Sequence, residues 1–207
     1  FISLIKSKPK IKKINLSLQE LDIDQLKKII IFIKPSNFNN LIRNKIKQVK
    51  LISEIEFYFK ENNVIEDFIA KGTVSDLNIE TIDNLTFKKT NFTFFADKTN
   101  ILIKNIFGEL EAVKIKNGDI RIRLLPEISL QSNFLTNLEY KDKSFEHYSN
   151  LIKNYQYAKN IINLEASINN NLSINFDKTY KVKNYSFTSN GIISKAITQK
   201  PKANDPD

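Results

Sequence analysis

Histidine is the side chain best suited to proton transfer near neutral pH, and the 207-residue sequence contains only one, His147. A Ser-His-Asp arrangement or an imidazole metal cluster would depend on that residue alone. It lies in the amphipathic stretch "FEHYSN", where a solvated or packed histidine is expected. Cysteine is absent, which excludes disulfides, thiolate metal sites and a cysteine nucleophile. We therefore predict that the chain is not an enzyme and uses no metal and no cofactor.

Acidic residues and glycines lack the spacing that hydrolysis or phosphate binding requires. The carboxylates of "SEIEFYFKEN" and "DIRIRL" alternate with apolar residues beside lysine or arginine, as on the solvated face of a sheet, and do not suggest a glycosidase pair. A phosphate-binding loop needs glycines close together in one turn. The four glycines here are far apart, so a nucleotide site is not expected: Gly72, Gly108, Gly118 and Gly191.

The formal net charge of +9 raises the question of an anionic partner. Arginine, the residue preferred for bidentate phosphate contacts, occurs only at Arg43, Arg121 and Arg123. The abundance of Ile and Asn indicates AT-rich coding, which also favours lysine codons. One cluster superficially resembles a platform for stacking nucleic-acid bases, namely Phe92, Phe94 and Phe95 with Lys88, Lys89 and Lys98. Because these Phe residues alternate with Thr and Asn, as on a buried sheet face, we expect no nucleic-acid partner.

A period of two dominates the chain and predicts the elements that position these side chains. In "KQVKLISEIEFYFKEN", residues 47–62, alternate positions are apolar apart from one serine, and charged residues lie mostly between them. Short polar turns separate further segments of this kind, and Asn117-Gly118 is typical of a hairpin turn. The pattern predicts an antiparallel meander.

Three stretches break the alternation and predict helices. Asp24 is a candidate N-cap for residues 25–34, whose apolar residues have helical spacing and end before Pro35. Ser36 is a candidate cap for a second helix with a narrow apolar stripe of Phe38, Leu41, Ile42 and Ile46. Residues 136–160 lose the alternation and show helical spacing again, which predicts a helical connection.

These elements predict a mainly β fold: a curved antiparallel sheet, a trough-like meander, with a helical hairpin near the N-terminus and one helix between sheet portions. The strand, hairpin and meander are expected in residues 1–135, the helical connection in 136–160, further strands in 161–197 and a polar tail in 198–207. The abrupt start without Met indicates a piece of a longer protein. By itself, the alternation favours a closed sandwich or barrel whose apolar residues pack only against each other.

The order of elements adds a resemblance to a known family. Residues 21–59, "LDIDQLKKIIIFIKPSNFNNLIRNKIKQVKLISEIEFYF", resemble the hallmark unit of the AsmA-like superfamily, in particular its YhdP/TamB-type members in double-membraned bacteria. That unit is a strand, an apolar helix ending near a proline, a second short helix and a long strand. Residues 72–124 resemble the alternating strands that follow it. The resemblance covers roughly residues 11–135 and, more loosely, residues 160–195.

The resemblance implies a periplasmic protein that is anchored to the inner membrane by a segment outside this sequence. Its curved sheet would form an apolar groove along which phospholipid acyl chains pass between the inner and outer membranes, with components of both membranes as partners. The alternative is a structural or protein-binding β-domain with a closed core and no lipid. The residues expected to line the groove are Val49, Leu51, Ile55, Phe57, Phe59, Phe68, Val74, Phe92, Phe94, Ile101, Ile103, Ile120 and Ile122.

Overall fold

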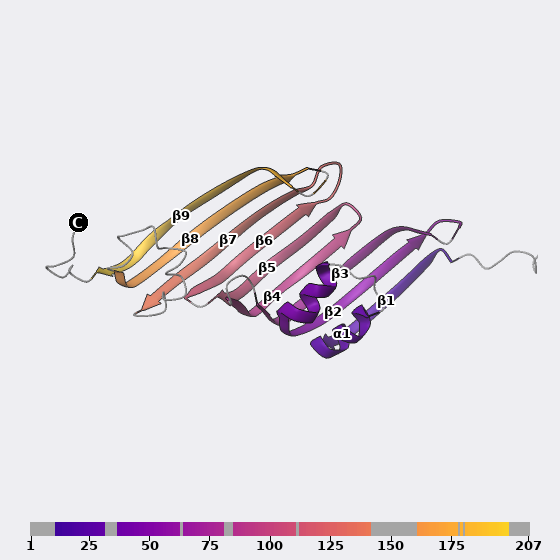
Figure 1. The fold of residues 1–207 in the computed structure, drawn as a ribbon, viewed down its shortest axis with the longest axis horizontal. Helices are drawn as coiled ribbons and strands as arrows, with labels where there is room; N and C mark the ends of the chain where they lie inside the picture. Colours follow the sequence, from indigo (N-terminus) through magenta and orange to yellow (C-terminus); the bar gives the residue numbers. More distant parts are fainter. Residues whose placement is uncertain are drawn as a thin grey trace, which may run out of the picture.

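Nine β-strands form a single antiparallel sheet in the computed structural model of the chain, and each strand pairs with its neighbours in the sequence (Figure 1). The structure describes residues 11–31, 37–62, 64–80, 85–110, 112–141, 161–177, 179 and 181–198. Within these residues β1 and β9 are the free edges, so the sheet is not closed into a barrel. The predicted mainly β meander is confirmed. Its strands are β1 (Lys13–Asp22), β2 (Ile46–Phe59), β3 (Ile65–Glu80), β4 (Thr86–Asp97), β5 (Asn100–Leu110), β6 (Val113–Arg123), β7 (Ser129–Lys141), β8 (Ile161–Phe176) and β9 (Val182–Thr198).

Hydrogen bonds from the backbone close the turns between strands. In the β2–β3 turn, the Lys60 amide donates to the Val64 carbonyl at 2.9 Å. In the β4–β5 turn, the Asp97 carboxylate accepts the amides of Thr99 and Asn100 at 2.7 and 2.8 Å. Aspartate turns of this kind do not require glycine, which is how a chain with only four glycines builds a long meander.

The first helix, α1 (Ile23–Ile30), begins two residues earlier than the sequence predicts. Its N-cap is Asp22, the last residue of β1, and not Asp24. The Asp22 carboxylate accepts the Gln25 amide at 2.8 Å, while the Gln25 side chain accepts the Asp22 amide at 2.9 Å. This reciprocal capping box satisfies two backbone donors at once, which a cap at Asp24 would not do.

The second helix starts as α2 (Asn37–Asn40) and continues as the π-helical turn η1 (Leu41–Lys45). The predicted pair of helices between the first two strands is therefore present, although Pro35 and Ser36 lie outside the described residues. The Asn39 side chain donates to the carbonyl of Ile30 at 3.2 Å and so satisfies the end of α1.

The two helices pack on one face of the sheet near β2 and β3 (Figure 1). Ile30 of α1 and Ile42 of η1 are the most buried hydrophobic side chains described, with exposed fractions of 2% and 4%. Below α1, three sheet residues form a small buried cluster against which Ile23 and Leu26 pack: Val49, Val74 and Leu77. The clustered part of the core thus lies at the margin of the sheet that the helices cover, while single buried residues such as Ile106, Tyr140 and Ala166 occur on the other strands.

The Asn117-Gly118 pair does not form the predicted hairpin turn, because both residues lie inside β6. The β6–β7 register shifts by one residue between Ile115 and Asn117, so the pair marks an irregularity within the strand. Gly118 has no positive φ, the property that favours glycine in a hairpin turn. A Cβ at this position would lie 2.6 Å from Cε1 of Phe134, which makes close approach of that ring the physical reason for glycine.

The first part of the expected helical connection is wrong, because residues 136–141 belong to β7. Leu138 and Tyr140 keep the alternation there and pair with Ala166 and Leu164 of β8. The helix expected near 144–156, with His147, lies outside the described residues, as does the tail after Thr198. No helix among the described residues has both the length and the apolar character needed to cross a bilayer.

Candidate functional site: the apolar face of the sheet

One face of the sheet carries apolar side chains on every strand, and we call it the apolar face. Cross-strand partners in register lie on the same face, because successive side chains alternate. Neighbouring strands are about 4.8 Å apart, so a ladder across all nine is about 38 Å long. One such ladder contains no polar residue: Leu16, Ile55, Ala70, Ala96, Ile101, Ile122, Leu130, Ile174 and Tyr185.

The adjacent ladder includes the small residues Ser53, Gly72 and Ser132, and next to Gly72 an aromatic ring lies close to the backbone. A Cβ on Gly72 would lie 2.9 Å from two ring atoms of Phe94 on the next strand, so the ring occupies the space above the glycine. Flat rings of this kind fill the face without a second layer. The ladder consists of Leu18, Ser53, Gly72, Phe94, Ile103, Ile120, Ser132, Leu172 and Phe187.

The strand register brings the thirteen predicted lining residues together on the apolar face. They belong to the two ladders above, to the neighbouring Leu51, Val74 and Phe92 ladder, or to the same alternation in β2 and β3. Val49 and Val74 are buried and the other eleven are half-buried. No large side chain among the described residues has an exposed fraction below 2%, as many would in a closed sandwich.

Most of the apolar face has no covering element among the described residues. The helices contact β1 and β2 at one margin, and the principal contacts of each remaining strand are with its neighbours in the sheet. Exposure is greatest at the far edge, where Tyr185 and Phe187 of β9 are 73% and 60% exposed. The face is therefore a broad apolar surface open on one side.

A few polar side chains interrupt the apolar face, and several of them form hydrogen bonds within the sheet. Ser53 is 3% exposed, and its hydroxyl donates to the Lys71 carbonyl at 3.1 Å. On β8, the Asn170 amide donates to the Thr136 hydroxyl oxygen at 3.0 Å and accepts the Ser189 hydroxyl at 2.9 Å. These bonds satisfy the groups locally, so the apolar face offers few free polar partners.

The opposite, polar face carries ion pairs between neighbouring strands. Lys13 of β1 lies 2.8 Å from Glu56 of β2, and Lys71 of β3 lies 2.8 Å from Glu54 of β2. The hydrogen bond from Lys13, supported by the Tyr58 hydroxyl at 2.6 Å, holds the pKa of Glu56 below its ordinary value. Exposed pairs of this kind contribute little stability, but they match the strand register and keep this face in water.

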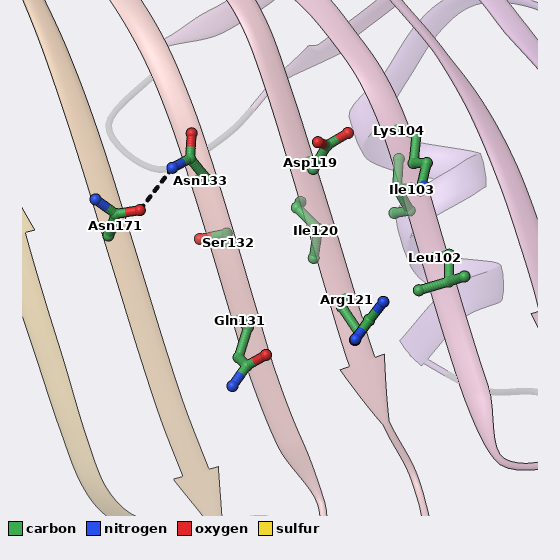
Figure 2. A pocket seen from close by; sticks show the side chains of 10 residues that line it. All are labelled: Leu102, Ile103, Lys104, Asp119, Ile120, Arg121, Gln131, Ser132, Asn133 and Asn171. Carbon is green, nitrogen blue, oxygen red and sulfur yellow. Dashed lines mark hydrogen bonds between the residues drawn. The ribbon is translucent and has the colours of Figure 1, made fainter.

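Figure 2 shows a shallow depression of about 340 Å³ on the polar face of β5 to β8. Leu102, Arg121 and Gln131 lie at one end, and Asp119 lies near an amide pair at the other. In that pair, Asn133 donates to Asn171 at 2.6 Å. The side chains come from the exposed faces of adjacent strands and enclose no buried charge, so the depression has the character of ordinary sheet surface.

The stacking platform suggested by three phenylalanines does not form. Phe92 and Phe94 lie on the apolar face with Val74 and Gly72, whereas Phe95 pairs with Lys71 and Leu102 on the polar face. Among the described residues, no group of three or more His, Cys, Asp or Glu side chains is placed to hold a metal ion.

Sequence reasoning missed a row of β-bulges across the sheet. Asp76, Lys89 and Asn105, on three adjacent strands, have positive φ values of 53°, 50° and 55°. The bulge at Asp76 has a signal in the sequence: between Val74 and Leu77 of β3, the apolar residues change from even-numbered to odd-numbered positions. Asn105, two residues after Ile103 in β5, is an exposed bulge residue and does not continue the apolar alternation.

Comparison with known proteins leaves the chain without a recognised relative. No protein-family model matches it, and no curated protein and no solved structure matches it either.

Proposed function

We propose that the apolar face binds the acyl chains of phospholipids and lets them move along the sheet, as part of a membrane-anchored periplasmic AsmA-like protein that conducts lipid between two membranes. The observation that carries this proposal is the uninterrupted apolar ladder through all nine strands, which no second layer covers within the described residues. A surface of this length fits an elongated apolar guest better than a compact one.

The energetics of lipid extraction explain why such a surface is needed. A buried methylene is worth about 0.8 kcal/mol, so a sixteen-carbon chain loses about 12 kcal/mol when it leaves a bilayer for water. An apolar surface about 38 Å long exceeds the depth of one leaflet, which is half of a hydrocarbon core about 30 Å thick. The acyl chain therefore has apolar contact along its whole length on the sheet.

Movement along the face requires that no single position binds too strongly. The lining residues are aliphatic or phenyl side chains of similar character, and the polar groups among them are bonded to the sheet. Neighbouring positions therefore offer an acyl chain nearly equal free energies. This arrangement needs no catalytic residue, because the lipid changes position and not covalent structure.

The neighbouring residues Phe94 and Phe95 provide a test with a matched control. Phe94 lies on the apolar face, and Phe95, 36% exposed, lies on the polar face of the same strand. A photoreactive phenylalanine analogue at either position, in the full-length protein in its own cells, is irradiated, and the adducts are identified by mass spectrometry. We expect phospholipid adducts at Phe94 and few at Phe95.

Equal yields at both positions, or no lipid at Phe94, would contradict the proposal. Protein adducts at Phe94 in place of lipid would instead support the rival function, a protein-binding or structural β-domain. Native mass spectrometry of the purified chain adds an independent measurement, because retained phospholipid appears there as a mass increment.

A further inference from the structure

A line of β-bulges crosses the middle strands of the sheet. Asp76, Lys89 and Asn105 each hold a left-handed backbone conformation in β3, β4 and β5 respectively. The β3–β4 register shifts between Val74 and Leu77, and the β4–β5 register shifts on either side of Asn91. Because a bulge bends its strand and increases the local twist, aligned bulges on adjacent strands produce a crease across the sheet.

Each bulge removes an amide from the strand ladder, and a side chain on an adjacent strand accepts it. The Asp76 amide donates to Asn91 of β4 at 3.0 Å, and the Lys89 amide donates to Asn78 of β3 at 2.9 Å. The Asn105 amide donates to Asp119 of β6 at 3.2 Å. All three bulges are therefore held by the same device, a carbonyl or carboxylate oxygen one strand away.

Asn91 and Asn78 also connect the bulges to one another and to β2. The Asn91 amide nitrogen donates to the Lys89 carbonyl at 2.8 Å, so this side chain joins the bulges of β3 and β4. The Asn78 amide nitrogen donates to the Gln48 side chain of β2 at 3.0 Å. Opening one bulge would break bonds that hold the next.

The crease keeps the apolar face continuous while the strands change direction. Val74 and Leu77 are three residues apart and would point to opposite faces of a regular strand. The bulge at Asp76 places both in the same buried cluster, together with Val49. On β4, Phe87 and Phe92 likewise share the apolar face on either side of Lys89, since they pair with Ile79 and Val74.

We propose that Asn78, Asn91 and Asp119 are positioning residues that hold this crease in place. They thereby determine how the apolar face continues along the length of strands β3, β4 and β5. The consequence for lipid rests on the proposed function: an acyl chain that crosses the crease depends on these three polar side chains, although none of them touches it. They lie on the polar face and therefore do not belong to the residues that would contact lipid.

Spin labels on the full chain measure the crease directly. The chain contains no cysteine, so Lys71→Cys and Glu80→Cys provide the only labelling sites. They lie on either side of Asp76 in β3, about 30 Å apart in an uninterrupted strand. We expect Asn91→Ala to broaden the distance distribution measured by pulsed electron paramagnetic resonance. Asn91→Asp keeps the acceptor oxygen for the Asp76 amide but loses the donor to the Lys89 carbonyl, so its distribution should be narrower than that of Asn91→Ala and broader than that of the parent chain.

Asn133→Ala is the matched control, because it removes a cross-strand amide bond on the polar face between β7 and β8, whereas the labels and the Asn91 bonds lie in β3 and β4. This variant should leave the distribution unchanged. A distribution in Asn91→Ala identical to that of the parent chain, or equal broadening in Asn133→Ala, would overturn the proposal, since the crease would then not depend on this side chain.

Photocrosslinking separates this inference from the proposed function. In the Asn91→Ala background, lipid adducts should persist at Phe94 and fall at Phe87, on the other side of the bulge, whereas loss of stability alone would lower both. Adducts retained equally at both positions would contradict a positioning role. If the parent chain gives no lipid adducts at Phe94, the proposed function fails, and the spin-label distances alone still decide whether Asn91 fixes the crease.

Discussion

At the scale of single residues, the sheet depends on a few backbone positions with unusual requirements. Of the three residues with positive φ in the described part of the chain, Asp76 and Asn105 are of the short polar type that tolerates the left-handed region, but Lys89 is not. Close approach of rings to backbone constrains Gly72 and Gly118 in a different way, since a Cβ there would meet a phenylalanine. The residue type that Gly72 and Gly118 allow is therefore determined by atoms on other strands.

Replacing Lys89 by glycine should stabilise the chain. The left-handed conformation at φ 50° costs an L-residue about 1–2 kcal/mol, and glycine avoids most of that cost but loses about 0.5–1 kcal/mol in backbone entropy. The exposed ion pair of Lys89 with Glu109, at 3.2 Å, contributes little. We expect the free energy of unfolding to rise by about 0.5 kcal/mol in denaturant titration. The same substitution at Lys71, which has no positive φ, should lower it.

Gly118→Ala should destabilise the chain by about 1–3 kcal/mol, the usual cost of overpacking. Its Cβ would lie 2.6 Å from Phe134 Cε1 and 3.3 Å from Ile106 Cβ, so the ring must leave its position. Denaturant unfolding of a double-mutant cycle with Phe134→Leu measures the effect. If the steric explanation holds, Gly118→Ala costs less in the Phe134→Leu background than in the parent chain. Equal costs in both backgrounds would assign the effect to the backbone.

At the scale of elements, aspartates organise the turns between strands. The Thr99 hydroxyl donates to Asp97 at 2.7 Å and is the main cause of a lowered pKa for Asp97, with the Thr99 amide next. The Thr179 hydroxyl and the Lys181 amide act in the same way on Asp177 in the β8–β9 turn. Both carboxylates therefore favour the folded turn when they are ionised.

The lowered pKa values predict a loss of stability in acid. A group whose pKa is depressed by folding stabilises the fold fully above its unfolded value, 3.8 for Asp, and loses that contribution as the pH falls through the lower folded value. Unfolding by denaturant between about pH 5 and pH 2 should therefore show a steeper loss for the parent chain than for Asp97→Asn. Parallel curves for the two chains would show that the Asp97 charge does not stabilise the turn.

At the scale of the whole molecule, the described sheet has two free edges of different character. β1 has ten residues, with charged residues at both ends, and leads into α1. β9 has seventeen residues, all exposed, and carries no charge between Lys183 and Lys195. Natural sheets protect long edges with lysine, proline or bulges, because unpaired backbone groups pair with other chains.

The chain on its own should self-associate through β9. Thr188→Lys together with Ile192→Lys adds two charges to the polar face of this edge, where Ile192 is 76% exposed, and should reduce association. Sedimentation velocity over a concentration series measures the effect. Ile52→Lys is the control, because Ile52 is a 52% exposed residue on the inner strand β2. A reduction by Ile52→Lys as large as that by the β9 variant would refute a role for the edge.

The sequence alone determined most of the strand segments, residues 136–141 excepted, and which of the thirteen predicted residues share a face. Alternation is a local property, because each side chain points away from its neighbour whatever the strand pairs with. It therefore placed the thirteen predicted residues on a common face before any strand pairing was known. The prediction of a turn at Asn117-Gly118 was wrong because glycine suits both a hairpin turn and a close contact with an aromatic ring. Only the position of Phe134 shows which of the two applies here.

Only the tertiary structure decided whether the sheet closes and where it bends. Closure depends on whether β1 meets β9, strands more than a hundred residues apart, and no local pattern encodes that meeting. The bulges depend on acceptors from other strands: Asn91 lies fifteen residues from the Asp76 amide that it accepts. Side-chain periodicity shows which face of a single strand is apolar. The curvature of the sheet depends on how the registers of many strands combine, and one strand's sequence does not contain that information.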